Sequence, residues 1–207
     1  MENRIKYIFC ELKTHIPFTV LATAVAILMV ITIFYFLKTV ISEEVFHFFH
    51  FFHIIASSMV TAGIFYKYKP KFIPALLVGM LGAIIIGSLS DVVFPYLGWF
   101  LLQIDIHFHL PLFEETVFVL SSAIIGSLAG ILIRTTKFPH FVHVFLSVFA
   151  SLFYLLVFTQ AFAPIYFILA FFIVFIAVII PCCLSDIAFP FIFLPRNNKK
   201  DIISQCH

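Results

Sequence analysis

The stretch FIPALLVGMLGAIIIGSLSDVVFPYLGWFLLQI, residues 72–104, decides the fold, because its only charged side chain is that of Asp91. About 20 helical residues cross the roughly 30 Å hydrocarbon core of a bilayer. The stretch therefore predicts a membrane-spanning helix. Pro95 predicts a break near the end of this helix, since a proline inside a helix removes a backbone hydrogen bond and clashes with the preceding turn.

The rest of the chain has the same apolar character. Of its 207 residues, 63% are hydrophobic and only 11% are charged, whereas a soluble domain is roughly half apolar and about a quarter charged. We therefore predict an all-α polytopic protein, one membrane domain over residues 1–207 that has the lipid bilayer as its solvent. The net charge of +2 and the lack of a basic run exclude a nucleic-acid partner, and the four cysteines lack zinc-finger spacing.

Long apolar runs divide the chain into six predicted spans. The first is expected to be a retained span, and the last is too long for one straight helix and contains Pro181 and Pro190. The third and sixth helices are therefore both predicted to be broken. The spans cover approximately residues 17–38, 48–66, 72–94, 112–133, 141–161 and 163–195.

Basic residues alternate between the connections of these spans. They gather before the first span, between the second and third, between the fourth and fifth, and after the sixth. The positive-inside rule then places both termini in the cytoplasm, with residues 196–207 as a cytoplasmic tail. The basic residues are Arg4, Lys6, Lys13, Lys67, Lys69, Lys71, Arg134, Lys137, Arg196, Lys199 and Lys200.

The sequence also resembles itself. The segment SLSDVVFP at 88–95 matches CLSDIAFP at 183–190, with identical residues at the Leu, Ser, Asp, Phe and Pro positions. Two further matches follow in the same order: His53, Ser57 and Thr61 with His143, Ser147 and Ser151, and His15-Ile-Pro17 with His109-Leu-Pro111. Repeats over approximately 12–104 and 105–195, each with three spans, would be inverted relative to one another, as in many secondary transporters.

Polar side chains within spans are costly and mark ion or substrate paths. The topology predicts an outer set, His53, Asp91 and His109, and an inner set, His15, His143 and Asp186. Two imidazoles and a carboxylate suit a divalent transition metal such as Zn, Fe, Mn, Ni or Co. Whether the two sets are separate or merge into one central site stays open. Ser57, Ser90, Ser147 and Ser185 are expected to act as second-sphere hydrogen-bonding groups.

Further potential ligands flank these sets. They predict either a metal-collecting vestibule or a belt of side chains that simply meets water and headgroups. These secondary candidates are His47, His50, His107, Glu114, Glu115 and His140.

We predict a transporter or channel for a divalent transition metal, and expect transport rather than catalysis. A membrane-embedded metal-dependent enzyme, a hydrolase or a di-metal oxidase, is the main alternative, although an HExxH motif is missing from the sequence. A haem-binding electron carrier and a proton-coupled transporter of another solute also stay open. So does assembly into a homo-oligomer.

Overall fold

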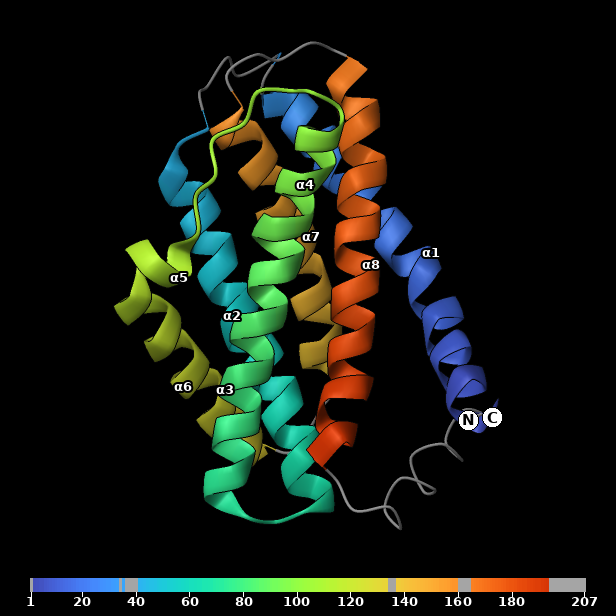
Figure 1. Cartoon of the computed structure of the whole chain (residues 1–207), viewed down its shortest axis with the longest axis vertical. Coiled ribbons are helices and arrows are strands. Elements are labelled where there is room, and N and C mark those ends of the chain that lie inside the picture. Colours follow the sequence, from blue (N-terminus) through green and yellow to red (C-terminus); the bar gives the residue numbers. More distant parts are fainter. Residues whose placement is uncertain (1, 34, 36–40, 134–136, 160–164, 194–207) are drawn as a thin grey trace.

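The computed structural model shows an all-α bundle (Figure 1). It describes the backbone of residues 2–33, 35, 41–133, 137–159 and 165–193, and the side chains of residues 16–33, 35, 41–133, 142–159 and 165–181. Within these ranges the only strand-like pairing is an isolated bridge between Ile106 and Thr159. The elements are α1 (Glu2–Thr32), α2 (Glu43–Tyr68), α3 (Phe72–Ser88), the π-helical turn η2 (Leu89–Val93), α4 (Phe94–Leu101), α5 (Pro111–Glu114), α6 (Thr116–Ile133), α7 (Lys137–Phe158) and α8 (Ile165–Phe193).

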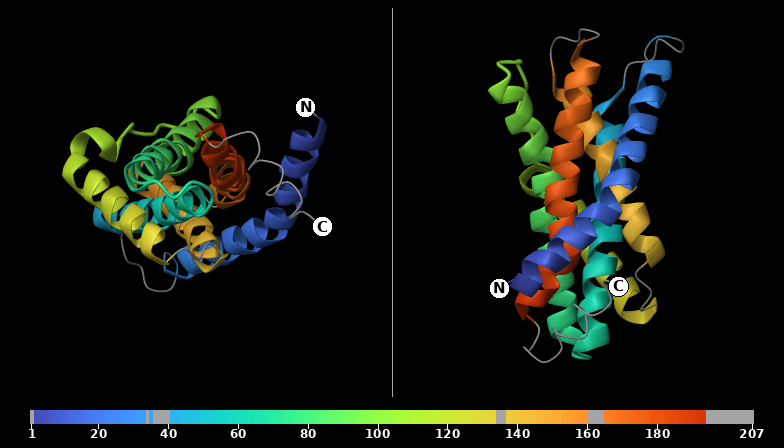
Figure 2. Two further views of the ribbon diagram at one scale, coloured as in Figure 1. Left: turned by 90° about the horizontal axis from the view of Figure 1, so that it is seen from below. Right: turned by 90° about the vertical axis from the view of Figure 1, so that its right-hand side faces the viewer.

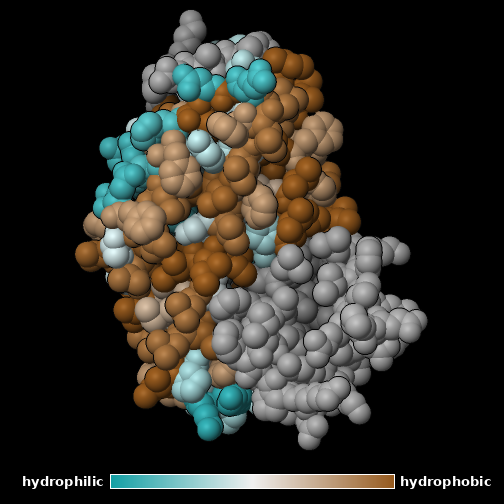
Figure 3. Space-filling view, viewed as in Figure 1, coloured by the Kyte–Doolittle hydropathy of each residue, from teal (hydrophilic) through white to brown (hydrophobic). Residues whose placement is uncertain are grey.

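Three of the described helices are long and apolar enough to cross a membrane: α2, the continuous helix formed by α3, η2 and α4, and α6. The surface agrees, because brown apolar side chains dominate the coloured part of the face in Figure 3, whereas the strongly hydrophilic ones gather at its top, its bottom and its upper left side. On α3, Ile73, Leu77, Leu81 and Ile85 recur every four residues and are all exposed. This spacing places them on one helix face, which is the face expected to meet lipid. The protein is therefore an integral membrane protein.

The chain alternates in direction along the bundle (Figures 1 and 2). Helix α1 runs upward in Figure 1, α2 downward and α3–α4 upward, whereas α6 runs downward, α7 upward and α8 downward. A described helix therefore lies within each of the six predicted spans, and the two halves of the chain have opposite senses. The number of membrane crossings, the cytoplasmic location of the termini and the inverted repeat itself stay predictions.

Small residues bring α6 close to α2. A Cβ atom on Gly126 would lie 2.1 Å from the carbonyl oxygen of Ile55, and one on Gly130 would lie 2.1 Å from that of Met59. Close backbone approach at small residues is the usual way in which membrane helices associate. The contact fixes α6 beside α2, the helix that carries most of the polar side chains discussed below.

The third helix changes its hydrogen-bonding pattern at Asp91 without ending. In η2 the backbone N–H of Phe94 donates to the carbonyl of Leu89, five residues earlier. The ring of a helical proline clashes with the carbonyl four residues before it, and for Pro95 that residue is Asp91. The wider π turn accommodates Pro95 there, so the predicted break takes the form of a π turn.

The sixth segment behaves differently. Helix α8 is one α-helix from Ile165 to Phe193 and includes both Pro181 and Pro190. The predicted break does not interrupt the described backbone of this helix. A proline can bend a helix without ending it, provided that neighbouring groups satisfy the freed carbonyl.

Candidate metal centre

The first turns of α2 present two potential metal ligands on one face. Ser42 precedes the helix in an extended conformation, and Glu43 and Glu44 occupy its first turn, where carboxylates interact favourably with the positive end of the helix dipole. Glu43 and His47 are four residues apart and therefore neighbours on the helix surface. The local sequence thus pairs a carboxylate with an imidazole.

His109 comes to this pair from the connection between α4 and α5. Its backbone N–H donates a hydrogen bond to the hydroxyl of Tyr154 on α7, at 3.2 Å. Its ring stacks on Phe158, with centroids 4.7 Å apart. Two residues earlier, the backbone N–H of His107 donates to the carbonyl of Phe158 at 2.9 Å. Helix α7 therefore holds the connection in place and keeps His109 buried.

The three side chains form a compact ligand set. The Nε2 atoms of His47 and His109 are 2.9 Å apart, and Oε1 of Glu43 lies 3.5 Å from Nε2 of His109 and 3.8 Å from Nε2 of His47. Around zinc, with bonds of about 2.0–2.2 Å, neighbouring atoms of a tetrahedron lie roughly 3.3–3.6 Å apart. The observed separations bracket this spacing, so the group could hold a metal ion with one coordination position open to water.

Glu114 completes the surroundings of His109. Its Oε2 atom lies 2.8 Å from Nδ1 of His109, an ion-pair distance. With Nδ1 beside this carboxylate, Nε2 of His109, the atom that belongs to the ligand set, faces Nε2 of His47. Metal-ligating histidines commonly have such a carboxylate behind them, which fixes the tautomer and the ring orientation.

A second polar group lies inside the bundle, centred on Asp91, which is fully buried. Its Oδ2 accepts hydrogen bonds from Nδ1 of His50 at 2.8 Å and Nδ1 of His53 at 2.7 Å. Its Oδ1 accepts from the hydroxyls of Ser90 and Ser147, both at 2.8 Å. Four donors from α2, η2 and α7 thus occupy one carboxylate.

His143 also belongs to this buried group. Its ring lies parallel to that of His53, with centroids 5.7 Å apart and an angle of 8° between the planes. On the same helix, Ser151 donates a hydrogen bond to the carbonyl of Ser90 at 2.9 Å. We refer to His50, His53, Asp91 and His143, with Ser90 and Ser147, as the Asp91 group.

The structure redistributes the predicted outer and inner sets. His53 and Asp91 lie together as expected, but His109 lies with Glu43 and His47 instead. His143, expected in the inner set, lies beside His53. The other members predicted for the inner side, the side chains of His15, His140, Ser185 and Asp186, lie outside the described residues, so an inner site stays a prediction.

The secondary candidates also separate. His47 and Glu114 join the metal centre and His50 joins the Asp91 group, whereas the side chain of His107 is exposed. Glu43 was missed by the sequence reasoning, although its spacing of four residues from His47 was a usable signal.

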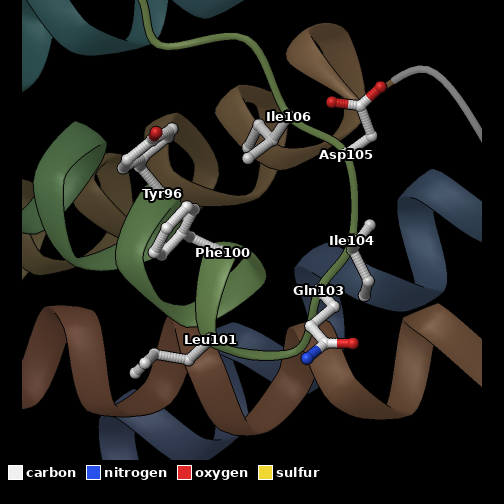
Figure 4. A pocket seen from close by; sticks show the side chains of 7 residues that line it. All are labelled: Tyr96, Phe100, Leu101, Gln103, Ile104, Asp105 and Ile106. Atoms are coloured by element: carbon white, nitrogen blue, oxygen red, sulfur yellow. The ribbon is translucent and has the colours of Figure 1, made fainter.

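A pocket at the end of α4 is a different feature (Figure 4). It contains one carboxylate, that of Asp105, but none of the residues of the metal centre. Its lining consists of Tyr96, Phe100, Leu101, Gln103, Ile104, Asp105 and Ile106.

No protein-family model, curated protein or solved structure matches this chain. Its function is therefore inferred from the site alone.

Proposed function

We propose that the protein transports a divalent transition-metal ion across the membrane and binds it first at Glu43, His47 and His109. Two imidazoles and one carboxylate suit a first-row transition metal, and the near-tetrahedral spacing favours zinc or an ion with similar geometry. The carboxylate of Glu43 is 48% exposed, whereas His109 is buried. An ion can therefore pass from water to the imidazoles without a large rearrangement.

The observation that carries the transport proposal is a file of polar side chains that continues inward from the metal centre along α2. Its members lie on one face of the helix, because they recur every three or four residues. The file covers roughly 21 Å at 1.5 Å per residue, a large part of the hydrocarbon core. It consists of His47, His50, His53, Ser57 and Thr61.

Burial makes this file unusual. Every member after His47 is fully buried, although polar groups away from water are costly and mark functional paths in membrane proteins. The hydroxyls of Ser57 and Thr61 have no hydrogen-bond partner among the described residues. Helical Ser and Thr commonly donate to a carbonyl in the preceding turn. Because the hydroxyls of Ser57 and Thr61 do not do so within the described helix α2, they can bind an ion or water.

Transport is testable with purified protein in liposomes that enclose a zinc-sensitive dye. We expect saturable zinc influx above that of empty liposomes. His109→Ala should abolish influx by removing a ligand, and Thr61→Val should reduce it by replacing a hydroxyl of the file with a methyl group. Thr116→Val is the matched control, because the hydroxyl of Thr116 is exposed and bonds to the carbonyl of Leu112. Zinc influx equal to that of empty liposomes would contradict the proposal.

A four-coordinate ion held by the three ligands of the metal centre would have one position left for water, which supports a second candidate, a membrane-embedded metal hydrolase. Two His and one Glu with a bound water form the ligand set of several catalytic zinc sites. Hydrolysis at this site would not need Ser57 and Thr61, the members of the file farthest from the metal centre. Zinc-dependent turnover that survives Thr61→Val, without any zinc influx, would favour the enzyme over the transporter.

A further inference from the structure

The Asp91 group has a composition and a bonding pattern that differ from those of the metal centre. An ionised carboxylate offers about four lone-pair sites, and in Asp91 all four are occupied by His50, His53, Ser90 and Ser147. A metal ion could bind this carboxylate only by displacing these donors. The one compact set of metal-ligand atoms found among the described side chains is Glu43, His47 and His109.

The group also carries almost all the ionisable chemistry of the bundle interior. Between residues 16–33, 46–66, 72–101, 116–133, 142–159 and 165–181, the only Asp, Glu, Lys, Arg or His side chains are the four of the Asp91 group and His47. The elements packed against η2 are α3, α4, α7 and α8, and α2 reaches it through the hydrogen bonds of His50 and His53 to Asp91. Of these, α7 contributes His143, and the described side chains of α3, α4 and α8 contribute no ionisable group of these kinds.

Charge balance then indicates what the group can hold. An ionised Asp91 with three neutral imidazoles has a net charge of −1 in a region where an uncompensated charge is costly. One added proton on an imidazole makes the group neutral. His50 offers a place for it, because its Nδ1 faces Asp91 while its Nε2 is buried and has no hydrogen-bond partner among the described residues.

We propose that the Asp91 group carries a proton that is exchanged for the transported metal ion, so that the protein is a metal–proton antiporter. The inference rests on the proposed transport function. Helix α2 connects the two sites, since His50 lies one helical turn beyond His47. A dication that moves from the metal centre into the file approaches the imidazolium of the protonated group, and these two positive charges repel.

In each cycle the Asp91 group loses one proton and regains one, so its own charge returns to the starting value. On approach of the dication, an N–H bond of an imidazolium breaks, its electron pair stays on the nitrogen, and the proton passes to water on the side from which the metal came. The Asp91 group returns to a net charge of −1, which attracts the ion inward. Reprotonation of the group from the opposite side then makes it neutral and favours release of the ion to that side.

The test measures zinc and proton movements together. Proteoliposomes enclose a pH-sensitive dye, potassium and valinomycin hold the membrane potential at zero, and zinc is added outside. Wild-type protein should raise the internal pH as zinc enters, and an imposed outward proton gradient should drive zinc accumulation. Asp91→Asn should lose the pH change, and Asp91→Glu should restore part of it.

Asp105→Asn is the matched control, because Asp105 is an exposed aspartate outside both sites and its amide variant should behave as wild type. Zinc binding in detergent checks that Asp91→Asn is folded, since the metal centre is separate. If Asp91→Asn no longer binds zinc, His53→Gln takes its place in the experiment, and the same loss of the internal pH change is expected.

Zinc influx without any proton movement in the wild type would overturn the antiport and leave the transport function standing. Proton coupling that persists in Asp91→Asn and in His53→Gln would overturn the role of the Asp91 group. Absence of zinc influx would overturn transport and antiport together.

Discussion

Replacement of Glu114 by Gln tests how much the negative charge next to His109 contributes to metal binding. Gln has nearly the same shape and can still accept a hydrogen bond through its amide oxygen, but it removes the negative charge 2.8 Å from Nδ1 of the imidazole. The ring then becomes a weaker ligand through Nε2. We therefore expect Glu114→Gln to weaken zinc binding and to leave the fold unchanged.

The magnitude follows from the exposure of the carboxylate. Loss of an outer-sphere partner typically lowers metal affinity by about 10–100-fold. The side chain of Glu114 is 55% exposed, so water replaces part of the interaction, and the lower end of this range applies. The expected loss is about tenfold, which corresponds to about 1.4 kcal/mol. His109→Ala removes a ligand and should cost substantially more.

Isothermal titration of the detergent-solubilised protein with zinc measures these differences. Glu115→Gln is the matched control: it removes the same charge one residue away, but among the described contacts its carboxylate forms no ion pair with either imidazole. The expected order of affinity loss is His109→Ala, then Glu114→Gln, then Glu115→Gln. Equal losses in the two Gln variants would show that general negative charge, and not the specific ion pair with His109, supports binding.

Three further results are expected. Gly130→Ala should lower the free energy of unfolding in detergent by about 1–3 kcal/mol or more, because the new Cβ would meet the Met59 backbone at 2.1 Å. Gly98→Ala should cost less, because its nearest neighbours are atoms of the Ile173 side chain. Equal effects of the two variants would contradict the close contact between α6 and α2. Ser147→Ala removes one of the four donors to Asp91 and should cost about 1.5–3 kcal/mol, measured by the same unfolding assay, and an unchanged melting temperature would argue against that bond. Zinc at about 100 times its dissociation constant should stabilise the protein by about 2.7 kcal/mol, and the gain should vanish with a chelator and in a variant that lacks both imidazole ligands.

Hydropathy alone was sufficient to predict the all-α membrane fold, because the need to satisfy backbone hydrogen bonds in lipid leaves helices as the structure for long apolar runs. The irregularity of the third helix was also predictable, since Pro95 conflicts with the carbonyl of Asp91. Its form, a π turn that continues into α4, depends on packing around Asp91 and could not be read from the local sequence. The continuity of α8 across Pro181 and Pro190 was likewise not predictable.

The site was predictable only in part. His53 and Asp91 were expected to meet because both fall towards the same side of the bundle, and they do lie together. His109 was assigned to them on the same reasoning, but its depth depends on how residues 102–110 cross α7. Tyr154 and Phe158 determine that path through contacts 45 and 49 residues away in sequence. Glu43 was overlooked because a carboxylate at the start of a span looks like an ordinary charge at the membrane surface.

X-ray absorption spectroscopy of the zinc-loaded protein tests most directly whether Glu43, His47 and His109 bind a metal. We expect a four-coordinate zinc with two imidazole ligands and oxygen donors at about 2.0–2.2 Å, and the imidazole scattering should diminish when His47 and His109 are both replaced by Ala. A spectrum with oxygen ligands alone, or one unchanged by the double replacement, would contradict the assignment.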